Sequence, residues 1–248
     1  MKFLTNTFYF NNEYRQGNQY YFTRADSPET LAKIRRTKDE SWYYWDRDIV
    51  YTVNQDYYRN PFEFSDVNWG EAIVLFGCSR TMGAGLTDED TISSYLSKYT
   101  SRPVINMGSA GTSMAWSFHN ACILGTYYKT PWAIVNLWTS TFRIVEYTST
   151  DEGLNNLGTW HVARPGDLLD RYTRDLENPK RWAQFYSMSS KLMWKDINYL
   201  EYSSFDDTIE ALECKELITI DRARDDTHPG RETAQLTASV IAKDLKLV

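Results

Sequence analysis

The chain reads Ile73-Val74-Leu75-Phe76 and then, without a break, Gly77-Cys78-Ser79-Arg80-Thr81. Consecutive apolar residues that end at a glycine predict a strand buried on both faces, as in a parallel sheet. Ser79 is therefore expected just beyond the carboxyl end of a core strand, between that strand and a following helix. In open α/β sheets this edge is where functional sites form.

Similar apolar runs recur along the chain. Helical segments are predicted at 87–99 and 113–128, between the runs, and this alternation is typical of βαβ units. We therefore predict an α/β fold with a parallel sheet. The predicted core strands are residues 73–76, 103–106, 132–138 and 216–220.

Two more helices are predicted near the end of the chain. Residues 181–200 carry apolar residues near helical spacing, namely Trp182, Phe185, Met188, Leu192 and Ile197. A last helix is predicted from Pro229, because proline is preferred at the first helical position. This helix is expected to direct Leu236, Val240, Ile241 and Leu245 toward the core.

The length of 248 residues suits one α/β domain with additions. Residues 1–70 are rich in Tyr, Asn, Asp and Arg, and we interpret them as an aromatic-rich N-terminal extension packed on the core, with a short strand at 49–53. Residues 71–248 form the predicted main domain. Within it, 147–186 has few apolar runs and is interpreted as an insertion near the site.

Composition limits the partners and the compartment. The net charge of −6 and the lack of a dense Lys/Arg block argue against nucleic-acid binding. Three widely spaced cysteines suggest neither a zinc site nor a disulfide framework. The N-terminus forms no signal core, and no segment has the length of a membrane span. We expect a cytoplasmic or other reducing location, with a phage-encoded or virion-associated protein left open.

A second motif, Asp225-Asp226-Thr227-His228-Pro229, supplies what a reactive serine needs. A serine hydroxyl is a poor nucleophile unless an imidazole accepts its proton and a carboxylate orients that imidazole. Of three histidines in the chain, only His228 has a carboxylate at short spacing. We predict Ser79 as nucleophile, His228 as base and Asp225 as orienting acid, with Asp226 as a competing partner of the ring.

Less specific interpretations exist for each of these residues. Ser79 could be a helix N-cap, and the Asp-x-x-His motif could be a polar cap on the last helix. Cys78 is an alternative nucleophile, although a free cysteine is more often a small buried apolar residue. His119 is interpreted as a packed or exposed helix residue, and His161 falls in the insertion.

Three sequence blocks in residues 71–248 resemble those of the SGNH, or GDSL-like, hydrolase family. The family's Gly-Asp-Ser-x-Thr/Ser block is matched by Gly77-Cys78-Ser79-Arg80-Thr81, and its Asp-x-x-His-Pro block by residues 225–229. The loop after the second strand, Asn106-Met107-Gly108-Ser109-Ala110-Gly111-Thr112-Ser113, is similar to the family's Asn-x-Gly-x-x-Gly pattern. The blocks occur in the family's order.

The resemblance implies a three-layer αβα sandwich with a flavodoxin-like sheet and an activity on ester bonds that requires no metal or other cofactor. It assigns to Ser79, His228 and Asp225 the same three roles. It also implies that the backbone N–H groups of Ser79 and Gly111 bind the oxyanion. The expected partner is a small-molecule or carbohydrate ester, and we expect Gly108, Thr139 and Arg143 to contact it.

The chain departs from the family pattern at two places. Cys78 replaces the aspartate that precedes the family's serine. After the third strand the family has Gly-x-Asn-Asp, whose Asn donates to the oxyanion, whereas this chain has Trp138-Thr139-Ser140-Thr141-Phe142-Arg143. Loss of one such donor can cost on the order of 10²–10³ in turnover. Ser140 is the candidate replacement, with Thr139 and Arg143 as alternatives.

The sequence thus predicts a serine-dependent ester hydrolase, with an acetyl group on a carbohydrate as the suggested substrate. An acyl group passed to an alcohol instead of water would make the protein an acyltransferase. A weak or inactive SGNH-like binding or structural module is the third hypothesis, favoured by the missing Asn. The substrate and the oligomeric state are left open.

Overall fold

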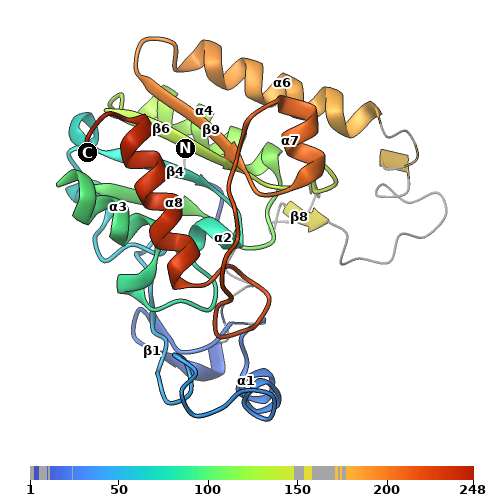
Figure 1. Ribbon diagram of the computed structural model, residues 1–248. Helices are drawn as coiled ribbons and strands as arrows, with labels where there is room; N and C mark the ends of the chain where they lie inside the picture. The colour runs from blue at the N-terminus through green and yellow to red at the C-terminus, as the bar shows by residue number, and fades with distance from the viewer. Residues whose placement is uncertain are drawn as a thin grey trace.

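Figure 1 shows a computed structural model of the chain, which describes residues 3–5, 10, 12–23, 25–147, 154–157, 171–172, 174 and 177–248. Its centre is a sheet of five parallel strands in the order β10-β9-β6-β4-β5. The strands are β4 (Ile73–Gly77), β5 (Val104–Gly108), β6 (Ala133–Trp138), β9 (Asn198–Ser203) and β10 (Lys215–Glu216).

Helices cover both faces of this sheet, which confirms the predicted α/β fold. The described α-helices are α1 (Pro28–Arg35), α2 (Ser79–Met82), α3 (Ile92–Thr100), α4 (Met114–Tyr127), α6 (Glu177–Met193), α7 (Asp206–Leu212) and α8 (Arg231–Asp244). In Figure 1, α3 and α8 pack against each other on the near side of the sheet, while α4 and α6 lie on the other. The layers are therefore helix, sheet, helix.

Smaller elements surround this framework. The strands β1 (Arg15–Gln16), β2 (Gln19–Tyr20) and β3 (Tyr51–Thr52) form a separate antiparallel sheet, and β7 (Ile144–Tyr147) pairs with β8 (Leu154–Leu157). Short 3₁₀ helices are η2 (Asn12–Tyr14), η3 (Phe64–Asp66), η4 (Trp69–Glu71) and η5 (Asp88–Asp90). Within the described parts of the chain, no helix combines the length and the apolar character needed to cross a membrane.

The first three predicted core strands are present, and their ends are aligned. Gly77 at the end of β4 is opposite Gly108 of β5 on one side and Leu137 of β6 on the other. Every residue of these three strands is buried. Because the strands are parallel, the loops that follow them emerge at one edge of the sheet.

The fourth predicted strand, 216–220, is wrong. Only Lys215–Glu216 pairs, as β10, and Ile218 and Ile220 are 61% and 56% exposed. The missing sheet position is taken by β9, where we predicted the end of a helix. The predicted helix 181–200 stops at Met193, because residues 198–203 are rich in strand-forming Tyr and pair along their whole length with β6.

The apolar residues of α6 face outward. Phe185, Met188 and Leu192 are 51%, 63% and 71% exposed, whereas the buried residues of this helix include the small side chains Ala183, Ser187 and Ser190. Helical spacing therefore predicted the helix correctly but did not identify its buried face. Small residues allow the helix to lie close to the rest of the molecule.

The last helix starts later than predicted. α8 begins at Arg231 with Gly230 as its N-cap, so Pro229 precedes the helix instead of opening it. Ile241 and Leu245 are buried as expected, but Leu236 is 39% exposed. Alanines at 234, 238 and 242 are three of the six buried residues of α8, and they permit its close packing on α3.

The N-terminal region contributes to the main core. Tyr20, Tyr44, Ile49 and Tyr51 belong to the same buried cluster as Ile73 and Leu75 of β4. Of the strand predicted at 49–53, only Tyr51–Thr52 pairs, as β3. Most of the predicted insertion at 147–186 lies outside the described residues, and its last part, from Glu177, is the start of α6.

Candidate active site

Ser79 is the first residue of α2 and follows β4 after a single residue, Cys78. The turn is tight enough to require glycine before it. A Cβ on Gly77 would lie 2.0 Å from the Thr81 hydroxyl oxygen and 2.8 Å from the Leu137 carbonyl oxygen. The sequence Gly-Cys-Ser therefore brings the serine hydroxyl to the carboxyl edge of the sheet.

The Ser79 side chain meets His228 there, although 149 positions separate them in the sequence. The Oγ of Ser79 lies 2.8 Å from Nε2 of His228, and Nδ1 of His228 lies 2.5 Å from Oδ2 of Asp225. The serine, imidazole and carboxylate thus form one hydrogen-bonded row. This is the geometry in which an imidazole can accept a serine proton.

Asp225 is held and ionised by its surroundings. Its other oxygen, Oδ1, accepts backbone N–H bonds from Thr227 at 3.1 Å and from His228 at 2.9 Å. Burial by itself raises the pKa of this carboxyl, but the bonds from His228 and Thr227 outweigh burial and leave its pKa below the usual value. The competing carboxylate, Asp226, instead bonds Lys38 Nζ at 3.0 Å.

The loop that begins at Ser109, after β5, lies beside the Ser79 turn. The Ser109 N–H donates to the Gly77 carbonyl at 3.0 Å, and the Asn106 amide donates to the Thr81 carbonyl at 2.9 Å. Gly111, farther along the loop, has a φ of +72°, which favours glycine. Binding of an oxyanion by the N–H groups of Ser79 and Gly111 remains a prediction.

Gly108 is located where packing requires a glycine. A Cβ at this position would lie 2.4 Å from the Met82 backbone nitrogen and 2.7 Å from the Thr81 Cβ. Its strand end therefore lies directly against α2. Contact of Gly108 with a substrate remains a prediction.

The hydroxyl of Ser140, the candidate third donor, is already occupied. It donates to Asp207 Oδ2 at 2.9 Å and accepts from the Phe142 N–H at 3.2 Å. The same Asp207 oxygen accepts bonds from the Thr141 N–H and hydroxyl at 2.6 and 2.8 Å. Because a serine has one proton to donate, Ser140 would have to leave Asp207 before it could bind an oxyanion. Nothing in the sequence pointed to Asp207.

Cys78 is 2% exposed, and the charges of two arginines act on its thiol. Burial raises the pKa of the thiol, but the charges of Arg143 and Arg80, a bond from the Arg80 backbone and the nearby Thr139 hydroxyl lower it to about 7. Both guanidinium groups lie over the ring of Phe205, at 4.4 Å for Arg80 and 5.2 Å for Arg143. Arg143 therefore lies near Cys78 and Phe205, and its contact with a substrate remains a prediction.

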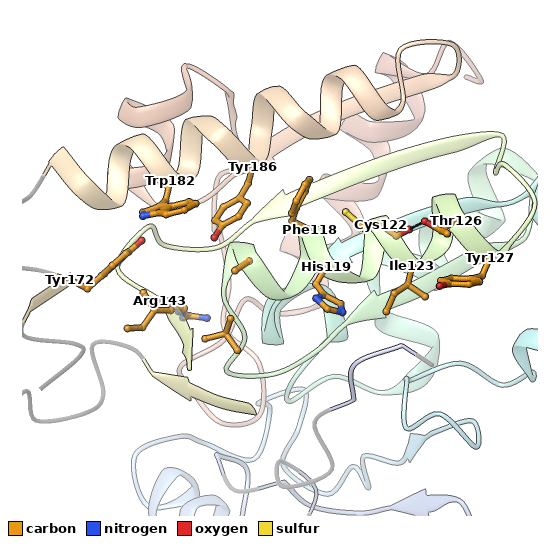
Figure 2. A pocket seen from close by; sticks show the side chains of 13 residues that line it. Phe118, His119, Cys122, Ile123, Thr126, Tyr127, Arg143, Tyr172, Trp182 and Tyr186 are labelled. Atoms are coloured by element: carbon orange, nitrogen blue, oxygen red, sulfur yellow. Dashed lines mark hydrogen bonds between the residues drawn. The ribbon is translucent and has the colours of Figure 1, made fainter. Parts of the chain in front are cut away.

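A pocket of about 510 Å³ lies between α4, β7 and α6 (Figure 2). Trp182 and Tyr186 point into it from α6, and their rings are stacked at 5.9 Å with an angle of 25°. Arg143 lies toward one end and Tyr127 at the other. Its remaining lining residues are mostly apolar, namely Ala115, Phe118, His119, Cys122, Ile123, Thr126, Ile144, Val145 and Tyr172.

His119, which the sequence left as a packed or exposed residue, is one wall of this pocket, and burial lowers the pKa of its ring. His161 lies outside the described residues. Across the described residues, no group of three or more His, Cys, Asp or Glu side chains could hold a metal ion. Sequence reasoning singled out Trp182 but did not identify Phe118 or Tyr186.

No protein-family model matches the chain, and a search of curated proteins finds no relative. Solved structures do resemble it. A protein titled as a lipolytic protein of the G-D-S-L family, from Desulfitobacterium hafniense, has a TM-score of 0.44 and 12% identity, covering 70% of this chain and 99% of its own. A GDSL-like lipase from Bacteroides uniformis has a TM-score of 0.46 and 10% identity, covering 72% and 96%.

A carbohydrate esterase family 2 enzyme with a carbohydrate-binding domain, from Corynascus thermopiles, has a TM-score of 0.47 and 12% identity, covering 71% of this chain and 67% of its own. Structures of the family that the three sequence blocks resemble are therefore among those with a similar arrangement of strands and helices. A similarity of this size says nothing about the reaction of this chain.

Proposed function

We propose that the protein is a serine-dependent ester hydrolase that acts through an acyl-serine intermediate. The observation that supports this proposal is the row of Ser79, His228 and Asp225, with separations of 2.8 Å and 2.5 Å between the reacting atoms. Such a row activates the hydroxyl and fixes the tautomer of the imidazole. A helix cap would need neither contact.

In the proposed reaction, His228 Nε2 accepts the proton of Ser79 as Oγ attacks the carbonyl carbon of the ester. The N–H groups of Ser79 and Gly111 bind the oxyanion that develops. The intermediate collapses, the bond to the alcohol breaks, and His228 returns its proton to the alcohol oxygen. Water then attacks the acyl-serine with His228 again as base, which releases the acid and restores Ser79. Asp225 stays ionised and orients the ring throughout.

For the substrate we propose an ester of a carbohydrate, such as an acetylated sugar. The pocket beside Arg143 supports this choice, because the Trp182 and Tyr186 rings offer flat apolar surfaces while tyrosine hydroxyls, His119 and Thr126 provide polar groups at the same walls. Pockets of this size with apolar walls and a few polar groups commonly hold small ligands. In this proposal the sugar occupies the pocket and the acyl group lies at Ser79.

The first test is covalent labelling with a fluorophosphonate probe. Ser79 Oγ would form a bond to phosphorus, fluoride would leave, and mass mapping would locate the adduct. We expect labelling at Ser79 in the unchanged protein and loss of at least about 10³-fold in rate in Ser79→Ala and His228→Ala. A well-folded protein that does not react, or that reacts at Cys78, would refute the proposal.

The second candidate function is a binding module without turnover. The observation that favours it is the bond from Ser140 to Asp207, which occupies the hydroxyl proton of the candidate replacement for the family's Asn donor. A protein that binds an acetylated sugar but neither labels nor hydrolyses it would support this alternative. Formation of a new ester when an alcohol is added, at the expense of free acid, would instead indicate acyl transfer.

A further inference from the structure

Residues 12–23 and 25–60, which we name the N-terminal segment, contact two loops at the proposed site: residues 83–86, which follow α2 and are named the Ser79 loop, and the loop that carries Asp225 and His228. Figure 1 shows β1 and α1 of this segment below α2 and the start of α8. Most of these contacts are hydrogen bonds from buried side chains to backbone atoms. A packing surface alone would not need such directed bonds, so each contact has a bearing on where the loops lie.

The first contact is a buried ion pair next to Asp225. Arg224, the preceding residue, donates from Nη2 to Asp26 Oδ2 at 2.6 Å and from Nε to Asp26 Oδ1 at 2.9 Å. The side chains are 2% and 0% exposed. Arg224 Nη2 also donates to the Tyr21 carbonyl at 2.9 Å. Asp26 of the N-terminal segment thus fixes the residue adjacent to the proposed orienting acid.

Tyr51 connects this ion pair to the Ser79 loop. Its buried hydroxyl donates to Asp26 Oδ2 at 2.9 Å and accepts the N–H of Gly85 at 2.9 Å. Gly85 in turn accepts the Arg224 N–H at 3.1 Å through its carbonyl. One tyrosine oxygen therefore links the loop after Ser79 with the side chain that holds the loop of Asp225.

The two loops touch at Gly85, and there is no spare room between them. Gly85 has a φ of +75°, and a Cβ on it would lie 2.8 Å from the Ala223 Cβ and 3.1 Å from the Arg224 nitrogen. A shift of either loop would consequently alter the separation of Ser79 and His228. The bonds of Tyr51 and Asp26 act at this contact.

Arg59 holds the Ser79 loop from the same segment. Its Nη1 donates to the Gly83 carbonyl at 2.5 Å and its Nη2 to the Leu86 carbonyl at 2.7 Å. The guanidinium also lies over the Tyr51 ring, 4.4 Å from its centre. The Gly83 N–H in turn donates to the Ser79 carbonyl at 3.0 Å. Arg59 thus holds a residue that is itself hydrogen-bonded to the serine.

We propose that Asp26, Tyr51 and Arg59 are positioning residues that hold Ser79 and the Asp225–His228 loop at reacting distance. This inference rests on the proposed function of that row. Residues 71–248 would then not be a self-sufficient hydrolase domain, because residues outside that range determine its geometry. None of the three side chains touches the reacting atoms.

The test compares two buried tyrosines whose hydroxyl bonds lead to different parts of the molecule. Tyr51→Phe removes the link between Asp26 and Gly85. Tyr58→Phe is the matched control: this hydroxyl is equally buried, donates to the Leu4 carbonyl and accepts from Asn120 at 2.8 Å, away from both loops. We expect both variants to lose thermal stability, since each loses two hydrogen bonds, and Tyr51→Phe to lose more, because its bond to the Asp26 carboxylate is charge-assisted.

The rate of fluorophosphonate labelling should separate them. Tyr51→Phe is expected to lower the labelling rate constant and kcat about tenfold with KM nearly unchanged, since small displacements of reacting groups cost rate steeply. Tyr58→Phe should stay within about twofold of the unchanged protein, the scatter expected of a change remote from the site. Equal rates in both variants, or equal losses, would overturn the positioning role.

A measurement that does not need turnover separates a failure of the positioning role from a failure of the proposed hydrolysis. The His228 Nδ1–H bond to Asp225 should give a far-downfield proton resonance in the unchanged protein and in Tyr58→Phe, displaced or broadened in Tyr51→Phe. If the unchanged protein does not label but the resonance responds in this way, the proposed hydrolysis fails while the positioning holds. An unresponsive resonance overturns the positioning itself.

Discussion

The N-terminal segment and the pocket between α4, β7 and α6 are built from different kinds of interaction. The N-terminal segment contributes buried charges and hydroxyls. Its Asp26, for example, pairs with Arg224, and the two side chains are 0% and 2% exposed. In the pocket the walls are rings and aliphatic chains, and Trp182 is 44% exposed. The contacts of the N-terminal segment fix their atoms in one arrangement, whereas the walls of the pocket allow a ligand more than one.

The physical reason is the directionality of the two interactions. Hydrogen bonds weaken steeply when their geometry changes, so a network of them defines loop positions. Contact between apolar surfaces depends mainly on area and allows small shifts. In this molecule, directed bonds hold the proposed catalytic loops and apolar contact is available for a ligand. Changes on the two sides should therefore have different consequences.

The largest effect is expected from Arg224→Met, which leaves the Asp26 charge buried without its partner. The free energy of unfolding should fall by about 3–5 kcal/mol, because an uncompensated buried charge is costly. Urea denaturation would measure this loss. Lys38→Met breaks the exposed pair with Asp226, and should cost less than about 1 kcal/mol. Equal effects would mean that the buried network contributes no more than a surface ion pair.

A smaller effect, dependent on pH, is expected at Cys78. The fold lowers the pKa of this thiol from 9.0 to about 7, so the folded state favours the thiolate. The resulting stabilisation is present above pH 9 and is lost as the pH falls through about 7. The difference in unfolding free energy between the unchanged protein and Cys78→Ala should therefore grow by about 2–3 kcal/mol from pH 6 to pH 9.

Denaturation at several pH values would measure that difference. A difference that stays constant between pH 6 and pH 9 would show that Arg143 and Arg80 do not hold a thiolate. Cys122→Ala is the control, because burial raises the pKa of that thiol and no neighbouring cation lowers it in the same way. Its stability difference should not grow over the same range.

The smallest effect is expected in the pocket. Trp182→Ala should raise KM for a sugar ester about tenfold with kcat little changed, because it removes one aromatic contact made equally in the ground state and the transition state. Phe185→Ala is the control, since this ring is similarly exposed at 51% but does not line the pocket. Steady-state kinetics would decide, and a fall in kcat would place Trp182 with the positioning groups instead.

Strands and site residues could be predicted where a short stretch of sequence specifies them, and could not where they depend on residues far apart in the chain. The strands β4, β5 and β6 follow from local apolar runs, and Ser79, Asp225 and His228 follow from short motifs. The strand β9 was missed because Asn198-Tyr199-Leu200-Glu201-Tyr202-Ser203 has no continuous apolar run. Its strand state depends on pairing with β6, which no local pattern reports.

By itself, the sequence determined the α/β class, the edge of the sheet at which the site forms, and the residue types able to do acyl chemistry there. Local propensity and the alternation of strands with helices suffice for those conclusions. Only the tertiary structure decided that Ser140 bonds Asp207 and that Asp26 pairs with Arg224 across 198 positions. Each of these depends on which distant side chains share a buried space, and hydrogen bonds form only where such groups come within about 3 Å of one another.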